Sequence, residues 1–334
     1  MSNPVLVEVT RGGRVESRHE GSVAVFDAAG KSVLSIGDVE AAVFPRSAVK
    51  AIQALPLVES GAAEHYRFGD RELAMACASH SGEPEHVAAS TDMLARASLD
   101  GGALECGVQW PADQKVTVAL ARSGHTPSAL HNNCSGKHSG FLCGCQHLRF
   151  NHAGYVHADH PYQELVRRSL AEVTGAEHGE RNRGIDGCSI PTYAVPLKSL
   201  ATGFAKMATG TGFSSDRAAA ARRLFAACMA EPFYVAGTDR ADVWLMQAAP
   251  GRIFAKGGAE GVHCAAIPEL GLGIALKCDD GHGRAAEAAC AAVLTKLFAD
   301  DGVVQAKLAD LVAPALKNWN GIHVGGLRPA AVLV

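Results

Sequence analysis

Short runs of alternating apolar and polar residues fill the first forty positions, and the pattern changes after Pro45. Alternation with a period of two predicts β-strands, and the glycine and aspartate residues between the runs predict turns. After Pro45, apolar residues recur at helical spacing through residues 47–60, which predicts a helix. The predicted strands cover residues 5–11, 15–21, 22–30 and 31–38.

The middle of the chain is rich in alanine, and strand patterns return toward the end. Helices are predicted near residues 85–99, 159–174 and 215–229, with glycine-rich loops at 132–144 and 184–191. The later strands are predicted at 251–258, 261–269 and 271–281, and helices follow at 283–300 and 305–316.

Strands at both ends, with helices between them, predict an α/β (α+β) fold in which both termini contribute to one sheet. We expect a single catalytic domain over residues 1–334. Its sheet subdomain would comprise about residues 1–45 and 250–334, and its helical subdomain about residues 46–249. The cleft between the two subdomains is where a site is expected.

Composition narrows the class of protein. Hydrophobic residues make up 48% and charged residues 19% of the 334 residues, as in a globular protein. The net charge of −3 gives no electrostatic reason for binding nucleic acid or an anionic membrane. No apolar run has membrane-spanning length, and no signal peptide is visible at the start. The ten cysteines are therefore interpreted as reduced thiols, and we expect a cytoplasmic protein.

The first candidate for chemistry is Ser47 with Lys50, three residues apart near the start of the helix predicted after Pro45. A serine hydroxyl becomes a useful nucleophile when a base takes its proton, and lysine is that base when its pKa is lowered. The spacing is that of serine–lysine acyl-transfer enzymes. The alternative is a helix cap followed by a solvated lysine.

A second element, Lys256 followed by Gly257 and Gly258, ends a predicted late strand. Enzymes of the penicillin-recognising fold carry a lysine and glycine at such a place beside the cleft, whereas the alternative is a strand-ending turn. Ser79 and His80 follow a short apolar run, and Ser79 is a candidate for a second pair with Lys256, unless these residues form an ordinary polar turn.

Two loop cysteines are candidates for metal binding. Cys134 and Lys137 lie in "NNCSGKHSG", and Cys188 follows Asp186 in "GIDGCSIP". Two thiolates and a neutral lysine amine from separate loops would hold one zinc ion. The alternative is that these are ordinary small buried residues, as free cysteines usually are.

The set of segments "PRSAVKAIQA", "ASHSGE", "NNCSGKHSGFL", "DGCSIPTYAVPL" and "AKGGAEGV" resembles the thermolabile, rhizobial-type L-asparaginase family over nearly the full length. That family is similar in fold to serine β-lactamases, penicillin-binding proteins and glutaminases. It is unrelated to the threonine-dependent bacterial asparaginases. One departure is Ala51, where many relatives have proline, and "RADVWLMQAAP" matches more weakly, so no site residue is carried over from it.

The resemblance implies a homodimeric enzyme with two serine–lysine pairs and a zinc ion. Residue by residue, it implies the pairs Ser47 with Lys50 and Ser79 with Lys256, the zinc ligands Cys134, Lys137 and Cys188, and the substrate-binding residues Arg46, His80 and Asp186.

The function expected is therefore hydrolysis of L-asparagine to L-aspartate and ammonia, with Ser47 preferred as the nucleophile and Lys50 as its base. Three alternatives stay open. These are a glutaminase, an exported enzyme of the β-lactamase or penicillin-binding type, and a non-catalytic zinc-binding or thiol-sensing protein.

Overall fold

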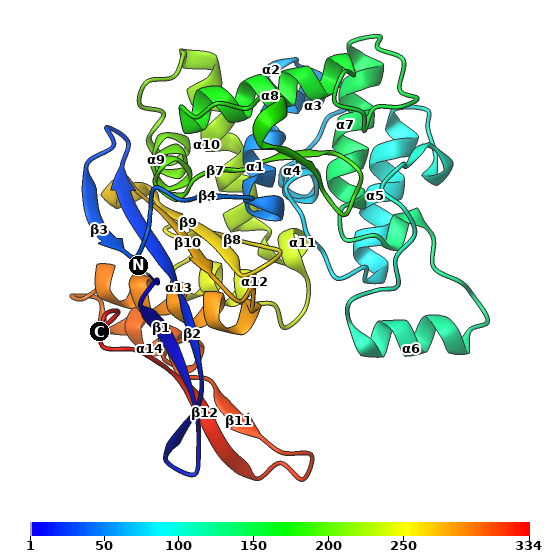
Figure 1. Cartoon of the computed structure of the whole chain (residues 1–334). Helices are drawn as coiled ribbons and strands as arrows, with labels where there is room; N and C mark the ends of the chain where they lie inside the picture. The colour runs from blue at the N-terminus through cyan, green and yellow to red at the C-terminus, as the bar shows by residue number, and fades with distance from the viewer. Residues whose placement is uncertain (1) are drawn as a thin grey trace.

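Strands from the two ends of the chain pair side by side in one antiparallel sheet (Figure 1). The computed structural model describes residues 2–334. The strand order is β11-β12-β1-β2-β10-β9-β8, and β3 pairs with β2. The bounds are β1 Val5–Arg11, β2 Arg14–Asp27, β3 Ser32–Ile36, β8 Phe254–Gly258, β9 Val262–Ile267, β10 Leu272–Cys278, β11 Ala315–Lys317 and β12 His323–Pro329.

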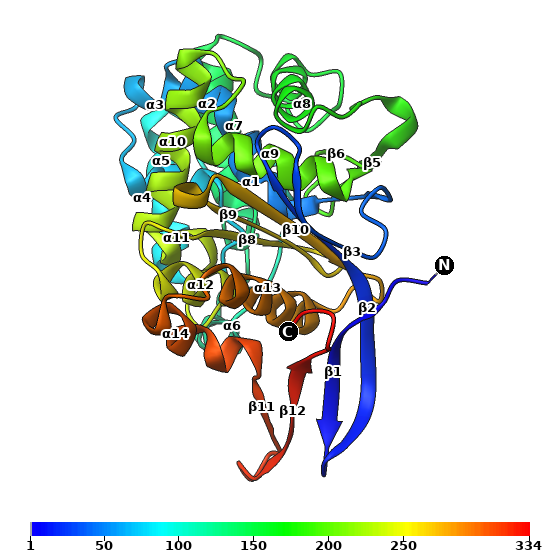
Figure 2. The ribbon, with the colours of Figure 1, turned by 90° about the vertical axis from the view of Figure 1, so that its left-hand side faces the viewer.

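Helices cover both faces of this sheet (Figure 2). On one face α9 packs against β2, β9 and β10, and on the other α13 packs against β9, β10 and β1. Because both faces are covered, every residue of β9 is buried, as expected for a strand without a solvent-facing side. The bounds are α9 Leu197–Thr209, α13 Gly283–Leu297 and, beside α13, α14 Gly302–Val312.

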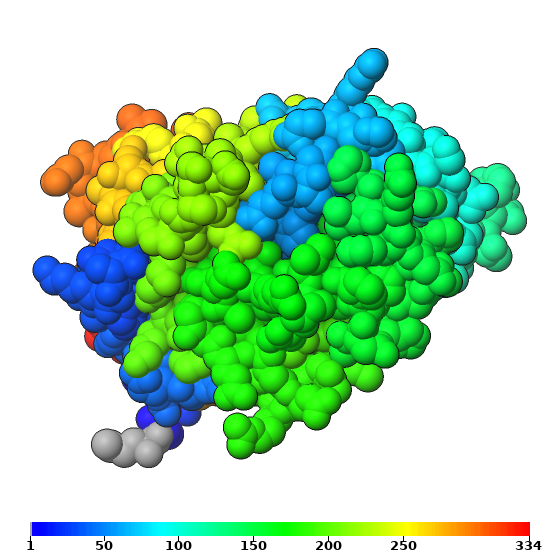
Figure 3. Space-filling model, turned by 90° about the horizontal axis from the view of Figure 1, so that it is seen from above, coloured from blue at the N-terminus to red at the C-terminus, as the bar shows by residue number. Residues whose placement is uncertain are grey.

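The remaining helices form a layered group beside the sheet, and the green part of the chain, which includes α8, covers much of the upper face (Figure 3). Their bounds are α1 Lys50–Gln53, α2 Leu55–Glu59, α3 Ala62–His65, α4 Asp70–Ala76, α5 Pro84–Arg96, α6 Gln114–Arg122, α7 Ser135–His147, α8 Pro161–Thr174, α10 Ser215–Ala230, α11 Pro232–Ala236 and α12 Ala241–Ala248. Two short strand pairs complete the fold: β4 Ala42–Val43 with β7 Val195–Pro196, and β5 Arg183–Ile185 with β6 Pro191–Tyr193.

The predicted fold class is confirmed: the protein is a mixed α/β chain whose antiparallel sheet is built from both termini. Three boundaries were wrong. Residues 15–21 and 22–30 form the single strand β2, because its first half pairs with β1 and its second half with β10. The helix predicted over 47–60 is broken into a 3₁₀ turn, η1 (Arg46–Val49), followed by α1 and α2. The last predicted helix ends at Val312, and β11 follows it.

The glycine-rich loop predicted over 132–144 is also wrong, because most of it is the buried helix α7. Its glycines recur every fourth residue and therefore lie on one face of the helix. A Cβ atom on Gly136 would lie 2.4 Å from the Met75 carbonyl oxygen, and one on Gly144 would lie 2.2 Å from the Tyr162 ring. Glycine is thus required for close packing of α7, and residues 186–190 alone remain a tight turn, between β5 and β6.

Candidate active site

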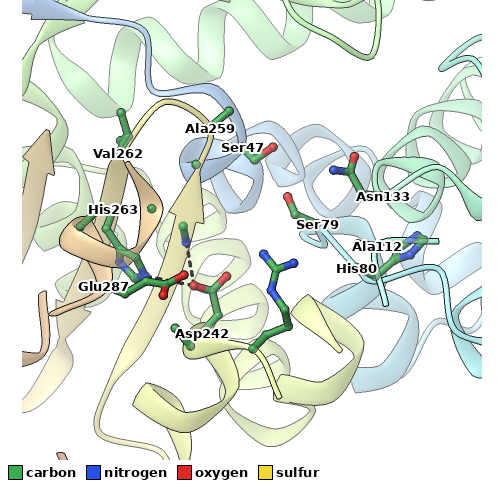
Figure 4. Close-up of a pocket in the computed structure, with 16 residues that line it drawn as sticks. Ser47, Ser79, His80, Ala112, Asn133, Asp242, Ala259, Val262, His263 and Glu287 are labelled. Carbon is green, nitrogen blue, oxygen red and sulfur yellow. Dashed lines mark hydrogen bonds and ion pairs between the residues drawn. The ribbon is translucent and has the colours of Figure 1, made fainter. Parts of the chain in front are cut away.

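A cavity of about 240 Å³ lies between the end of β8 and the helical part of the chain. Figure 4 shows Ser47 and Ser79 on one side of it, with Asp242 and Glu287 across from them. The polar side chains that line it come from distant segments: Ser47 from η1, Ser79 and His80 from the loop after α4, Asn133 before α7, Arg240 and Asp242 at the start of α12, His263 from β9 and Glu287 from α13.

Ser47 lies in the first turn of η1, directly after a strained residue. Arg46 has a φ of 50°, in the left-handed region that residues with a Cβ rarely adopt. The next strand comes very close, because a Cβ on Gly258 would lie 2.5 Å from the Pro45 carbonyl oxygen and 3.0 Å from the Ala48 nitrogen. Gly258 therefore lets β8 pack against η1. Strain of this kind gathers at functional sites.

Lys50 is completely buried beneath this turn, and its amine points to the second serine. Its Nζ donates hydrogen bonds to Ser79 Oγ at 2.8 Å, to the Ala78 carbonyl oxygen at 2.5 Å and to Cys134 Sγ at 3.1 Å. Burial lowers the pKa of Lys50 from its ordinary value, because a charged amine is poorly solvated inside the protein. The site thus places a buried lysine amine in contact with a serine hydroxyl.

The hydrogen bonds pair the predicted residues differently from the sequence-based pairs. Ser47 and Ser79 line the same cavity, but Lys50 donates to Ser79. Lys256 is also buried, and its Nζ donates to Asp242 Oδ2 at 3.2 Å and to the Gly257 carbonyl oxygen at 2.9 Å. The structure therefore brings all four residues to one region, while their catalytic roles stay predictions.

Sequence reasoning missed four charged or titratable residues that line the cavity, which are Arg240, Asp242, His263 and Glu287. Asp242 has the most hydrogen-bond partners of the four. Its Oδ1 also accepts hydrogen bonds from the Gly257 nitrogen at 2.9 Å and from His263 Nε2 at 3.0 Å. Burial alone would raise the pKa of this carboxyl, but Lys256 and His263 outweigh burial and hold it well below its usual range. In the sequence, Asp242 is indistinguishable from an ordinary acidic residue in the first turn of a helix.

The predicted zinc ligands meet in a second buried cluster. Lys137 Nζ donates to Cys188 Sγ at 3.0 Å, and Cys134 and Cys188 are 4% and 3% exposed. A hydrogen bond from the Cys188 thiol, together with the charges of Lys50 and Lys137, lowers the pKa of Cys134 well below its usual range. Two thiols and an amine that converge out of solvent suit a zinc ion.

Within residues 2–334, no group of three His, Cys, Asp or Glu side chains is arranged to hold a metal ion. The predicted zinc site therefore depends on the Lys137 amine as its third donor. Lysine binds a metal only as the neutral amine, so metal binding there would release a proton.

The three predicted substrate-binding residues are engaged with the protein itself. Arg46 Nε donates to Asp186 Oδ1 at 2.6 Å, and neither residue lines the cavity. His80 lines the cavity, but its Nδ1 accepts from the Gly82 nitrogen, and its Nε2 lies 2.9 Å from Ser135 Oγ. Burial lowers the pKa of His80 well below its ordinary value, so the ring is neutral and its two nitrogens already have partners.

Comparison with known families identifies the protein as an enzyme of the amidohydrolase class. The family model described as L-asparaginase II matches residues 7–329. The chain belongs to the L-asparaginase II family, and it is therefore an L-asparaginase, which hydrolyses L-asparagine to L-aspartate and ammonia. No curated protein sequence matches the chain.

Similar solved structures include Mglu, with 19% identity and a TM-score of 0.38 over 84% of this chain and 67% of that chain. They also include Mglu in its L-glutamate binding form, with 19% identity and a TM-score of 0.39 over 89% of this chain and 64% of that chain. A β-lactamase from Mycobacterium bovis matches with 15% identity and a TM-score of 0.38 over 87% of this chain and 94% of that chain. This chain thus spans about two thirds of the length of Mglu.

Proposed function

We propose that the protein hydrolyses L-asparagine through a serine acyl-enzyme, with Ser47 as the nucleophile, Ser79 as a proton relay and Lys50 as the base. The observation that carries this proposal is the 2.8 Å hydrogen bond from the completely buried Lys50 amine to Ser79 Oγ. Ser79, which accepts that hydrogen bond, lines the same cavity as Ser47. A serine hydroxyl connected to a desolvated amine is the arrangement that nucleophilic acyl transfer requires.

In the first step, Ser47 Oγ attacks the side-chain amide carbon of asparagine. Its proton passes to Ser79 Oγ while the Ser79 proton passes to the neutral amine of Lys50. Return of a proton along the same path to the amide nitrogen accompanies cleavage of the C–N bond, and ammonia leaves. Water then hydrolyses the aspartyl ester on Ser47 through the same proton relay and regenerates the hydroxyl.

The tetrahedral intermediate carries a negative oxygen that needs hydrogen-bond donors. The backbone N–H groups of Ser47 and Ala259 are suited to this, because both residues line the cavity. Within residues 2–334, neither N–H donates to another backbone group outside its own element. The close approach of β8 to η1, which Gly258 permits, is what places these two segments together.

Cys134, Lys137 and Cys188 would hold a zinc ion beside this machinery, and the chemistry that zinc supplies when bound is polarisation of a nearby oxygen atom. These ligands would also link the start of α7 to the turn between β5 and β6. The Arg46–Asp186 ion pair makes a similar link, because it connects η1 to that turn.

We also retain the homodimer and the cytoplasmic location as predictions, to be checked by sedimentation and by cell fractionation. No helix among residues 2–334 has the length and apolar character that crossing a membrane requires.

The proposed function is tested by measuring ammonia release from L-asparagine and L-glutamine and cleavage of a chromogenic β-lactam. We expect turnover of L-asparagine with a kcat/KM at least about tenfold above that for L-glutamine, since one extra methylene changes the fit by about 1–3 kcal/mol. Preference for L-glutamine would favour the glutaminase alternative. Preference for the β-lactam would favour the penicillin-recognising alternative, and no turnover of any of the three would favour a sensor.

Elemental analysis tests the zinc site. We expect about one zinc ion per chain in the wild type and less than a tenth of that in Cys188→Ala, because a site with two donors holds zinc weakly. Cys145→Ala is the matched control, since that cysteine is buried elsewhere on α7 and burial raises the pKa of its thiol to about 12. Wild-type protein that is active and contains no zinc would contradict the metal proposal.

A further inference from the structure

Two charged side chains on the cavity wall have no hydrogen-bond or ion-pair partner among residues 2–334. Arg240, at the start of α12, is exposed and lines the cavity. Glu287, on α13, also lines it and is half-buried. Among residues 2–334, neither side chain takes part in a hydrogen bond or an ion pair with another residue. A half-buried carboxylate without a partner, such as that of Glu287, is costly unless a ligand supplies the missing charge. The Arg240 guanidinium is exposed and is free to contact a ligand.

The other charges of the cavity are already satisfied. The Asp242 carboxylate accepts hydrogen bonds from Lys256, His263 and the Gly257 nitrogen. Arg240 influences both carboxylates through space, because its charge lowers the pKa of Asp242 and of Glu287. Burial nevertheless raises the pKa of Glu287 above its ordinary value, although the charges of His263 and Arg240 act in the opposite direction. One cation and one carboxylate are thus left to face a ligand.

We propose that Arg240 binds the α-carboxylate and Glu287 the α-ammonium group of the substrate amino acid. This inference rests on the proposed function, because it concerns the same cavity and the same amide substrate. A guanidinium group presents paired donors that match a carboxylate. A carboxylate accepts from the three donors of an ammonium ion. The two residues therefore recognise the part of asparagine that does not react.

This placement would also select the handedness and the length of the substrate. Figure 4 shows Glu287 across the cavity from Ser47 and Ser79, and Arg240 lines the same cavity. Arg240 and Glu287 would fix two substituents of the α-carbon, while the serines would fix the side-chain amide. Three fixed points distinguish an L-amino acid from its mirror image. Binding energy from the unreactive groups would hold the amide carbon against Ser47, which is how remote contacts raise the rate of reaction.

The test uses amides that lack one of the two groups. β-Alaninamide is asparagine without the α-carboxylate, and succinamate is asparagine without the α-ammonium group. We expect Arg240→Met to lower kcat/KM for L-asparagine by about 100-fold, mostly through KM, and to change the value for β-alaninamide by less than about threefold. We expect Glu287→Gln to lower kcat/KM by about 30-fold for L-asparagine and to change kcat/KM by less than about threefold for succinamate.

Arg14→Met is the matched control, because Arg14 is an exposed arginine at the start of β2 that does not line the cavity. It should leave all rates unchanged, and thermal unfolding of each variant checks that it is folded. Calorimetry with L-aspartate, β-alanine and succinate provides a readout that needs no turnover. We expect Arg240→Met to weaken L-aspartate binding and to leave β-alanine binding unchanged, with Glu287→Gln behaving in the same way toward succinate.

Equal losses for intact and truncated ligands, or no loss in either variant, would overturn the assignment of these two residues. Wild-type protein that binds L-aspartate with the expected pattern but releases no ammonia would instead refute the proposed function and retain the binding assignment.

Discussion

Replacing Ser47 with alanine is expected to lower kcat for L-asparagine by about 10⁴-fold, the loss typical of removing an enzyme nucleophile. The variant should fold normally, because the hydroxyl faces the cavity and makes no hydrogen bond to another residue among residues 2–334. The measurement is ammonia release together with mass spectrometry of acid-quenched reactions. In the wild type, mass spectrometry should locate the aspartyl adduct on Ser47.

Ser79→Ala should cause a loss of similar size, because the relay between Ser47 and Lys50 passes through its hydroxyl. The double variant should be no worse than either single one, since residues that act as a unit are not additive. Ser60→Ala is the control, because Ser60 is a helix-end residue whose hydroxyl bonds only within that turn. An adduct on Ser79, or Ser47→Ala activity within tenfold of wild type, would exclude Ser47 as the nucleophile.

The sequence was a better guide to which residues lie near the site than to which of them are hydrogen-bonded to one another. Ser-x-x-Lys spacing correctly placed Ser47 and Lys50 at the start of a helical segment. The direction of a long lysine side chain, however, depends on what packs around it. Here the loop after α4 brings Ser79 and the Ala78 carbonyl oxygen to the amine, and nothing in the spacing of residues 47–50 contains that information.

The prediction for α7 failed for a related reason. Glycines usually indicate loops, but at every fourth position they form a smooth helix face against the Met75 backbone and the Tyr162 ring. The helix is buried on all sides, so it has no polar face whose spacing would have predicted it. By contrast, strands such as β1 and β10 and the N-terminal part of α13 were predicted because their patterns are local.

Asp242 could not be found by pattern, because an acidic residue is favourable in the first turn of any helix. Its importance arises only when β8 and β9 bring Lys256 and His263 to its carboxylate. A buried charge of this kind is stable only in the completed fold, where its partners are in place.

Replacing Asp242 with asparagine is therefore expected to lower the free energy of unfolding by about 3–5 kcal/mol, because Lys256 loses its buried counter-charge. Asparagine keeps the shape and the acceptor for the Gly257 nitrogen, so the loss reports the charge. Asp216→Asn is the matched control: Asp216 is also in the first turn of a helix, but it is exposed, and its replacement should cost less than about 1 kcal/mol. Denaturant unfolding measures both variants.

The dependence of this loss on pH follows from the two titrating partners. Because Lys256 and His263 lower the pKa of Asp242, its contribution is complete above about pH 3.9, the ordinary value, and is lost as the pH falls toward the folded-state pKa. Burial lowers the pKa of His263, but Cys290 and Asp242 outweigh it and raise that pKa well above its ordinary value. The contribution of His263 is therefore complete below about pH 6.5 and is lost as the pH rises through the folded-state pKa.

The difference in unfolding free energy between wild type and Asp242→Asn should be largest between about pH 4 and 6.5 and should shrink on the alkaline side. A difference that grows steadily with pH above 6.5 would show that His263 is not a charged partner of Asp242.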